Sequence, residues 1–331
     1  MSQTESPYPS DPARDPAQID LPPVEAPSAG FIVQLFVIPA VIVAVVIVVW
    51  LLFGKLAGGE RDAMEYVEQL RSPSAHWRAA YELASLIQND PKLANDPKLL
   101  GELTDLLEHD LDQKESPDLT QYVALTLGAF QTLDATSGGR KRDPIAVLAR
   151  TLDAKQPTPV RLAAAISLAK HAARLDGRLD DPAAIKALEQ AGEDPNIGLR
   201  QAAAYALGFF GGADSTRVLR DRLKDVDCYT RYNAAVALGR RGDLQSQGVF
   251  REMLRTDDLN KVIDIASPSE KHNKVEAIQL EALQALEYAA DHKVPALTQA
   301  LRPEIEALTK SGLASIRTRA LAVLKSLPAG S

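Results

Sequence analysis

The chain has 331 residues, of which 46% are hydrophobic and only 5% aromatic, enough for a large core built of Ala, Leu and Val. Its formal net charge of -7 makes it a poor match for a nucleic-acid phosphate backbone, so no nucleic-acid partner is expected. The single cysteine, Cys228, excludes an intramolecular disulfide and any multi-cysteine metal site.

The first 29 residues are rich in proline and in acidic side chains. They hold seven prolines, and five carboxylates stand against one arginine, Arg14. Such a segment has too little apolar side chain to offset the entropy lost on ordering. We therefore expect residues 1–29 to form a disordered acidic Pro-rich tail. The alternative is a proline-rich ligand for an adaptor protein.

Residues 31–53 form a run of 23 residues without a charge. A helix of this length spans about 34 Å, more than the ~30 Å hydrocarbon core of a bilayer. A cleaved secretory signal fits less well, because it needs a basic start and a shorter apolar run. The sequence thus predicts a transmembrane helix over residues 30–54, in contact with the lipid bilayer from Phe31 to Phe53, and a Gly hinge at residues 55–59.

The positive charges beside this run decide the expected orientation. Lys55 and Arg61 follow it closely, whereas Arg14 is the only Lys or Arg before it. The side that carries more Lys and Arg usually faces the cytoplasm. We therefore expect a single-pass membrane protein with its repeat domain in the cytoplasm and its N-terminal tail outside.

One ten-residue pattern organises the rest of the chain. LRQAAAYALG, Leu199 to Gly208, returns as TRYNAAVALG, Thr230 to Gly239, and seven such copies begin at residues 75, 119, 160, 199, 230, 278 and 316. In Leu199 to Gly208 the apolar residues recur at steps of three and four, which places them on one face of a helix. The alanines in the middle let neighbouring helices approach closely. Self-similarity at this period is typical of stacked helical repeats.

A second helix is expected between successive copies. Three of these begin with a dipeptide whose aspartate can cap free amides and whose proline suits the first helical position; the dipeptides are Asp96-Pro97, Asp143-Pro144 and Asp181-Pro182. The sequence shows no strand-like alternation of useful length. Each unit is therefore a helical hairpin that must stack on its neighbours. The predicted fold is all-α, an α-solenoid (superhelix) of about seven hairpins over residues 60–328.

Two segments, DPNIGLRQAAAYALG at 194–208 and LKDVDCYTRYNAAVALGRRGD at 223–243, resemble HEAT repeats, in particular the short type also found in phycobilisome lyases. The resemblance implies a ladder between units, in which an Asp in the turn pairs with an Arg that opens the second helix. By motif position the arginines are Arg161, Arg200, Arg231 and Arg317, and the aspartates are Asp194 and either Asp225 or Asp227. Other residues hold the Arg position in three further units, where the ladder is expected to be incomplete: His76, Thr120 and Gln279.

The sequence shows no catalytic, cofactor-binding or metal-binding constellation. No two histidines have the three- or four-residue spacing that puts two ligands on one helix face; the five are His76, His109, His171, His272 and His292. None is followed by Glu, unlike the His-Glu pairs of the HEAT-type di-iron hydroxylases. No Gly-rich phosphate loop and no Gly-x-Ser-x-Gly elbow occurs. We therefore predict a non-enzymatic protein without a cofactor.

Two interruptions of the repeats are candidates for function, because loops carry function more often than helices. The first, Ala135 to Arg142, is a Gly-bearing loop that offers Arg140, Lys141 and Arg142 to anionic lipid or to an acidic partner. The alternative is a plain solvated loop. The second, residues 256–273, makes the sixth unit the longest and has room for one extra helical turn.

These features together favour a membrane-anchored HEAT-repeat scaffold that binds another protein and performs no catalysis. Two alternatives stay open: a bilin-handling enzyme similar to the phycobilisome lyases, and a HEAT-like nucleic-acid binder. The sequence identifies neither the partner protein nor the face of the solenoid that meets it.

Overall fold

The structure is a computed structural model that describes residue 30 and residues 41–49, 62–72, 76–113, 116–292 and 294–327. The chain divides into two units, Met1–Arg61 and Asp62–Ser331. The predicted tail at 1–29 and the predicted hinge at 55–59 lie outside the described residues.

The structure contradicts the predicted transmembrane helix. Within residues 30–54 it describes only Gly30 and a helical stretch at 41–49, while residues 31–40 and 50–54 lie outside the described ones. No helix among the described residues is both long enough and apolar enough to cross a bilayer. The prediction of a single-pass membrane protein with cytoplasmic repeats is therefore wrong, and the predicted lipid contact from Phe31 to Phe53 has no support.

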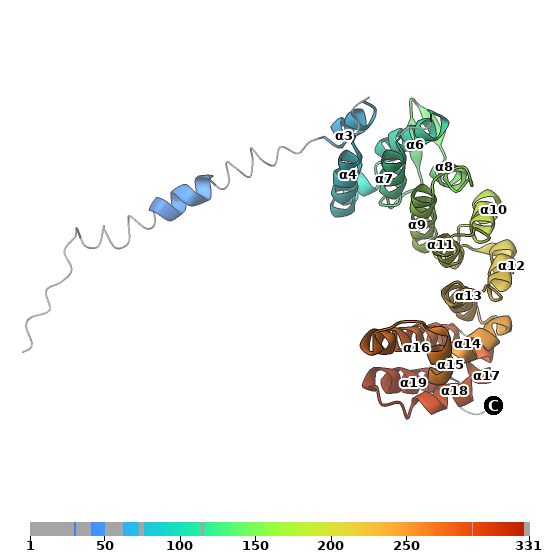
Figure 1. Cartoon of the computed structure of the whole chain (residues 1–331). Coiled ribbons are helices and arrows are strands. Elements are labelled where there is room, and N and C mark those ends of the chain that lie inside the picture. Colours follow the sequence, from blue (N-terminus) through green and yellow to red (C-terminus); the bar gives the residue numbers. More distant parts are fainter. Residues whose placement is uncertain are drawn as a thin grey trace, which may run out of the picture. The chain divides into compact units, whose positions relative to one another are not determined.

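From residue 63 onward the described chain is mainly a succession of helical hairpins, as predicted for an all-α solenoid. Each of the seven repeated segments contributes to one helix of an inner layer, which lies on the concave side of the curve that this unit makes in Figure 1. These inner helices are α4 (Trp77–Asn89), α7 (Pro117–Leu127), α9 (Thr158–Arg174), α11 (Ile197–Leu207), α13 (Cys228–Arg240), α16 (Pro268–Asp291) and α19 (Ala314–Ser326).

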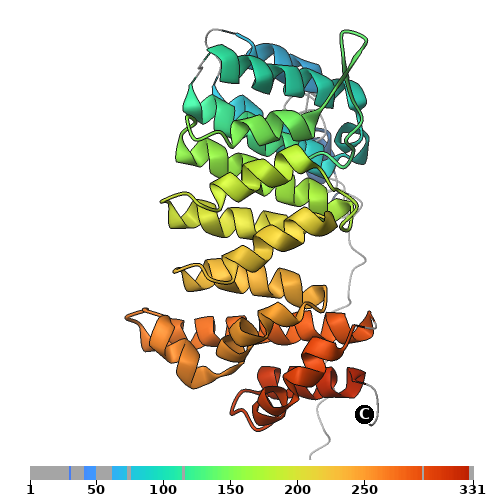
Figure 2. The same ribbon diagram turned by 90° about the vertical axis from the view of Figure 1, so that its right-hand side faces the viewer.

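The other helix of each hairpin, which precedes the inner helix in the chain, belongs to an outer layer, and Figure 2 shows the hairpins stacked one below another in chain order. The outer helices are α3 (Ala63–Leu70), α6 (Pro97–Gln113), α8 (Pro144–Thr151), α10 (Pro182–Ala191), α12 (Gly212–Arg222), α14 (Gln247–Leu254) and α18 (Arg302–Leu308). Shorter helices fill some connections: α5 (Pro91–Ala94), η2 (Leu244–Ser246), α15 (Thr256–Val262) and α17 (Ala296–Ala300).

The core lies between the two layers and is made largely of alanine and leucine. In α11, Leu199, Ala203 and Leu207 are fully buried, because a spacing of four residues keeps them on one face of the helix. Buried alanines such as Ala204 let α9, α11 and α13 pack side by side. The buried side chains form two clusters that meet at α13, which contributes Leu238 to one and Tyr232 to the other.

The three Asp-Pro dipeptides begin helices, as predicted. The carboxylates of Asp96, Asp143 and Asp181 accept hydrogen bonds from backbone amides in the first turns of α6, α8 and α10. Each following proline takes the first helical position, where its missing N–H leaves no unsatisfied bond. The Asp-Pro dipeptides therefore predicted these three helix starts correctly.

The segment expected to be a loop at 135–142 is a small β-hairpin, and this difference corrects the expectation that no strand occurs. β1 (Ala135–Ser137) pairs antiparallel with β2 (Arg140–Arg142). Gly138 and Gly139 have φ of +56° and +72°, and the favoured two-residue hairpin loop requires positive φ at both positions. β1 lies against α6, where a Cβ on Gly101 would stand 2.2 Å from the carbonyl oxygen of Thr136.

Candidate functional site

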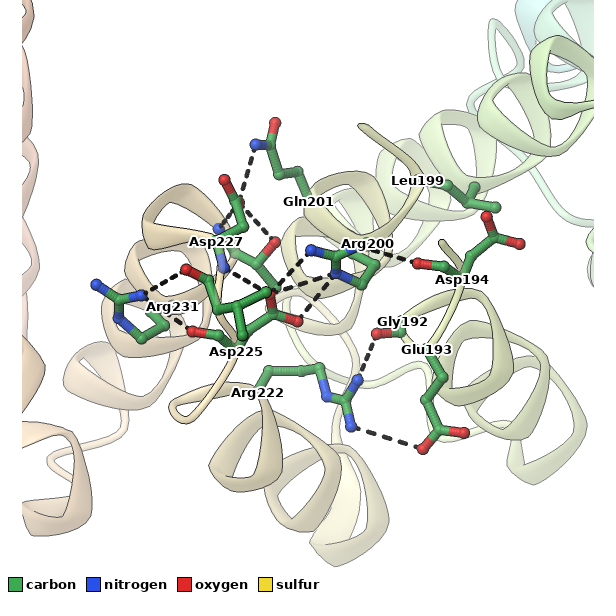
Figure 3. Close-up of polar contacts among 12 residues, drawn as sticks. Gly192, Glu193, Asp194, Leu199, Arg200, Gln201, Arg222, Asp225, Asp227 and Arg231 are labelled. Atoms are coloured by element: carbon green, nitrogen blue, oxygen red, sulfur yellow. Dashed lines mark hydrogen bonds and ion pairs between the residues drawn. The ribbon is translucent and has the colours of Figure 1, made fainter. Parts of the chain in front are cut away.

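Arginines at the starts of inner helices link each hairpin to the next. Arg200 of α11 lies beside Asp225 of the following turn, with Nε 3.1 Å from Oδ2 and side chains that are 11% and 7% exposed. Its Nη1 also donates to the carbonyl oxygens of Asp194 and Pro195 in its own turn. Figure 3 shows Arg200 between these two turns. One guanidinium therefore ties two hairpins together at a position nearly closed to water.

The other predicted arginines differ in their partners. Arg161 Nη1 lies 2.5 Å from Asp194 Oδ2, so this pair also joins consecutive hairpins. Arg231 Nη2 lies 2.8 Å from Glu252 Oε1, a carboxylate on α14 rather than an aspartate in a turn. Arg317 of the last hairpin donates to two backbone carbonyls of its own turn and has no carboxylate partner among the described residues.

Of the two aspartates that the sequence left open, Asp225 is the one that meets Arg200. Asp227 instead caps α13 by accepting the Thr230 amide, and it accepts Gln201 Nε2 of the preceding hairpin at 2.9 Å. Burial favours a raised pKa for the Asp227 carboxyl, but the hydrogen bonds from Gln201 and Thr230 outweigh it and the pKa is lowered. Both aspartates therefore connect hairpins, through different donors.

A second set of basic side chains, which the sequence did not single out, lies at the other ends of the inner helices. Arg174 at the end of α9 donates to the carbonyl oxygen of Gly128, just after α7, at 2.8 Å. Arg241, just after α13, donates to Phe210 O at 2.7 Å and to Leu207 O at 3.2 Å. The last carbonyls of a helix have no partner within it. Each of these arginines therefore caps the inner helix of the preceding hairpin.

His171 takes part in the same capping and is held neutral. Its Nε2 lies 3.0 Å from the carbonyl oxygen of Leu127, so Nε2 carries the hydrogen, since a carbonyl only accepts. Its Nδ1 then accepts from Arg174 Nη1 at 3.4 Å. Burial, together with the positive charge of Arg174, lowers the pKa of His171 from 6.5 to about 4. A second proton on Nδ1 would face the Arg174 guanidinium.

The predicted basic interaction site divides into a paired and an unpaired part. Arg142 forms an ion pair with Asp105 of α6, and this pairing raises the pKa of the guanidinium. Arg140 and Lys141 are exposed, and neither has an ion pair within the part of the chain that the structure describes. The hairpin thus presents two free cations rather than the three that the sequence suggested.

The inner face carries a row of four apolar side chains, of which three are exposed and one, Leu125, is half-buried. They stand at the seventh position of four consecutive repeats, on α4, α7, α9 and α11, and are Tyr81, Leu125, Ile166 and Tyr205. Three of them are 61%, 42% and 52% exposed: Tyr81, Ile166 and Tyr205. Tyr205 follows the buried Ala203 by two residues, so it points about 200° away from that core position around the helix axis. We call these four residues the inner-face row.

A hollow of about 540 Å³ adjoins the inner-face row at the ends of the inner helices, lined by Phe209, Arg240 and Tyr288 from three consecutive hairpins, among others. The Tyr205 and Phe209 rings pack edge to face with centroids 5.0 Å apart. The half-buried Arg240 guanidinium has no ion pair or hydrogen bond to any other described residue. The hollow therefore combines aromatic surface with an unpaired positive charge.

The described residues offer no centre for metal or thiol chemistry. No group of three His, Cys, Asp or Glu side chains among them is placed to hold a metal ion. Burial raises the pKa of the Cys228 thiol, which keeps it in the unreactive protonated form.

The fold and its inter-hairpin ties define an α-helical repeat protein of the solenoid type. Within this class, the sequence model of the family described as HEAT repeats matches residues 169–239, from the end of α9 into α13. The turns that carry Asp194 and Asp225 lie inside this match. No curated protein matches the chain.

Several solved structures are similar to this chain. For the Escherichia coli protein YibA the identity is 17%, the match covers 82% of this chain and 84% of that one, and the TM-score is 0.48. For a designed armadillo repeat protein the identity is 17%, the coverage 80% and 99%, and the TM-score 0.36. For human deoxyhypusine hydroxylase in complex with glycerol the identity is 16% and the TM-score is 0.31. That match covers 83% of this chain and 98% of the hydroxylase chain.

Proposed function

We propose that this protein is a scaffold that binds another protein through the inner face of its helical repeats. The observation that carries the proposal is the inner-face row, whose apolar side chains come from four consecutive inner helices and are exposed at Tyr81, Ile166 and Tyr205. Apolar side chains that gather on a protein surface mark interaction sites, and aromatic residues are enriched at their centres. Single exposed apolar residues elsewhere would need no such explanation.

The ties between hairpins support the same proposal, because they fix the positions of the row residues before a partner arrives. Arg161 and Arg200 pair with carboxylates at one edge of the inner helices, and Arg174 and Arg241 cap carbonyls at the other edge. A surface held at both edges loses little conformational freedom on binding, which favours affinity. The inner face is therefore a preorganised surface.

Site-specific photo-crosslinking in cells tests the proposal. A photoreactive phenylalanine analogue would replace Tyr81, Ile166 or Tyr205, one at a time, in the full chain. We expect the same partner protein, identified by mass spectrometry, to be captured from all three positions, because they lie on one face.

Two exposed apolar residues outside the inner helices serve as matched controls. Val226 is 91% exposed in the turn before α13, and Leu244 is 54% exposed in η2. The analogue at these positions should not capture the partner. Capture at the control positions but not at the row would place the binding surface elsewhere. Capture of a bilin or a nucleic acid at the row would replace the proposal.

A further inference from the structure

We infer that the inner-face row recognises a polyproline II segment of the partner protein, apolar at every third residue and acidic in between. The inference rests on the proposed function, since it requires the inner face to be the binding surface. It adds the conformation and the charge of the bound segment, which follow from the spacing of the row and from its unpaired cations.

The spacing of the row fits a polyproline II helix. The helices α4, α7, α9 and α11 pack side by side in that order, and packed helices lie ~8–10 Å apart. A polyproline II helix has three residues per turn and rises ~3.1 Å per residue, so every third side chain returns to the same side after ~9 Å. Each apolar residue of such a segment would therefore meet one residue of the row.

Other regular conformations do not keep this register. Side chains on one face of a β-strand recur every ~6.6 Å, which is shorter than one helix-to-helix step. An α-helix laid across the row returns to the same face every ~5.4 Å. A segment in either conformation would lose alignment with the row after the first inner helix.

The aromatic composition of the face suits the same occupant. Trp77 of α4 stacks on Tyr122 of α7 with ring centroids 4.7 Å apart, and Trp77 lies one turn before Tyr81. Tyr205 and Phe209 form the second aromatic pair. Grooves lined with aromatic side chains are the usual docking surface for polyproline II segments.

The charge of the face argues for acidic residues between the apolar ones. Lys170 stands four residues after Ile166 on α9 and is exposed, and Arg240 lies on the next inner helix after Tyr205. Neither cation has an ion pair within the described residues. The carboxylates of Asp176 and Glu281 stand close to the hollow, but neither is within ion-pair distance of Arg240. A carboxylate of the partner would complement these two cations.

The test uses a fluorescein-labelled peptide of four Leu-Pro-Asp triplets and the full chain, with binding followed by fluorescence anisotropy. A peptide of four Leu-Pro-Lys triplets keeps the apolar period and reverses the charge. A scrambled peptide keeps the Leu-Pro-Asp composition and removes the period. We expect the acidic triplet peptide to bind at least about tenfold more tightly than either of the other two, because both the period and the charge contribute.

Protein variants locate the binding. Tyr205→Ser and the double variant Lys170→Gln with Arg240→Gln should each weaken binding of the acidic peptide by about tenfold, and the double variant should also reduce its salt dependence. The matched controls Val226→Ser and Arg140→Gln remove an exposed apolar residue and an exposed cation elsewhere, and should leave binding unchanged. Circular dichroism confirms that each variant is folded.

Equal binding of the three peptides, no binding of the acidic one, or no effect of Tyr205→Ser would overturn the inference. If the row positions still capture a partner protein in cells while the acidic triplet peptide does not bind, only this inference fails. If the row positions capture no partner protein and the acidic triplet peptide does not bind, both this inference and the proposed function fail.

Discussion

At the scale of single residues, the pair of Arg200 and Asp225 shows how two hairpins are held in register. A charge taken out of water is costly unless it is paired and hydrogen-bonded. Here the Asp225 carboxylate accepts hydrogen bonds from the Arg200 guanidinium of the preceding hairpin and from the backbone amide of Asp227 in its own turn. Arg200 and Asp225 therefore neutralise each other's charge only when the two hairpins are stacked.

Replacing Arg200 with methionine tests this dependence. We expect Arg200→Met to lower the free energy of unfolding by about 3 kcal/mol, because the variant leaves the Asp225 carboxylate nearly buried without its cation. Arg317→Met is the matched control, since among the described residues the Arg317 guanidinium hydrogen-bonds only to backbone carbonyls, and it should cost about 1 kcal/mol or less. Urea denaturation at neutral pH, followed by circular dichroism, measures both. Equal losses would mean that the inter-hairpin ion pair adds nothing.

His171 makes stability depend on pH. Its folded pKa of about 4 lies below the unfolded value of 6.5, so the unfolded chain binds the proton first as the pH falls. The contribution of the neutral ring is complete above pH 6.5 and is lost as the pH falls toward 4, amounting to about 3 kcal/mol. His171→Gln, which keeps an amide donor for Leu127 O, should lack this loss. Denaturation curves between pH 7 and pH 4 measure the difference from the original chain.

The exposed His109 on α6 gives the control for that experiment. His109→Gln should show the same fall in stability with pH as the original chain. If His171→Gln also shows the full fall, the buried ring is not the group that titrates.

The sequence could predict part of these residue-level ties. Its repeat placed Arg161, Arg200 and Arg231 at equivalent positions, where the structure finds each beside a carboxylate of the next hairpin. The partner Glu252 could not be predicted, because it depends on how α14 packs. The capping roles of Arg174 and Arg241 were missed because their acceptors are backbone carbonyls, which every residue carries.

At the scale of elements, the β-hairpin is held against α6 through Gly101. Gly101→Ala removes the helix-weakening effect of glycine, worth about 1 kcal/mol, but its Cβ would overlap the backbone of Thr136. We therefore expect a net loss of stability and a displaced hairpin, seen as faster amide exchange in residues 135–142. Gly248→Ala in α14 meets no atom within 4 Å and should be neutral or slightly stabilising. A stabilising Gly101→Ala would show that the contact is loose.

Elements with a strong local signal were predicted well. The seven inner helices followed from apolar spacing, and the starts of α6, α8 and α10 from Asp-Pro dipeptides. The hairpin was missed although Gly138-Gly139 is a typical hairpin signal, because three-residue strands are too short to show alternation. The transmembrane prediction rested on the length of one apolar run, whereas no helix among the described residues is both long enough and apolar enough to cross a bilayer.

At the scale of the whole repeat unit, stability should spread from hairpin to neighbouring hairpin, as in other stacked repeats. Leu207 is fully buried in α11, and Leu207→Ala should cost about 2 to 5 kcal/mol. Because the buried clusters meet at α13, we expect amide exchange to accelerate most in α9, α11 and α13 and least in α19. Hydrogen exchange with mass spectrometry measures this gradient, and uniform acceleration across all hairpins would contradict it.

Hydroxyl-radical footprinting of the full chain, with and without the partner captured by crosslinking, tests the central claim most directly. The account predicts that partner binding protects Tyr81 and Tyr205 of the inner-face row from oxidation and leaves Val226 as reactive as before. Protection of Val226 or of the outer helices, with both tyrosines unchanged, would contradict it.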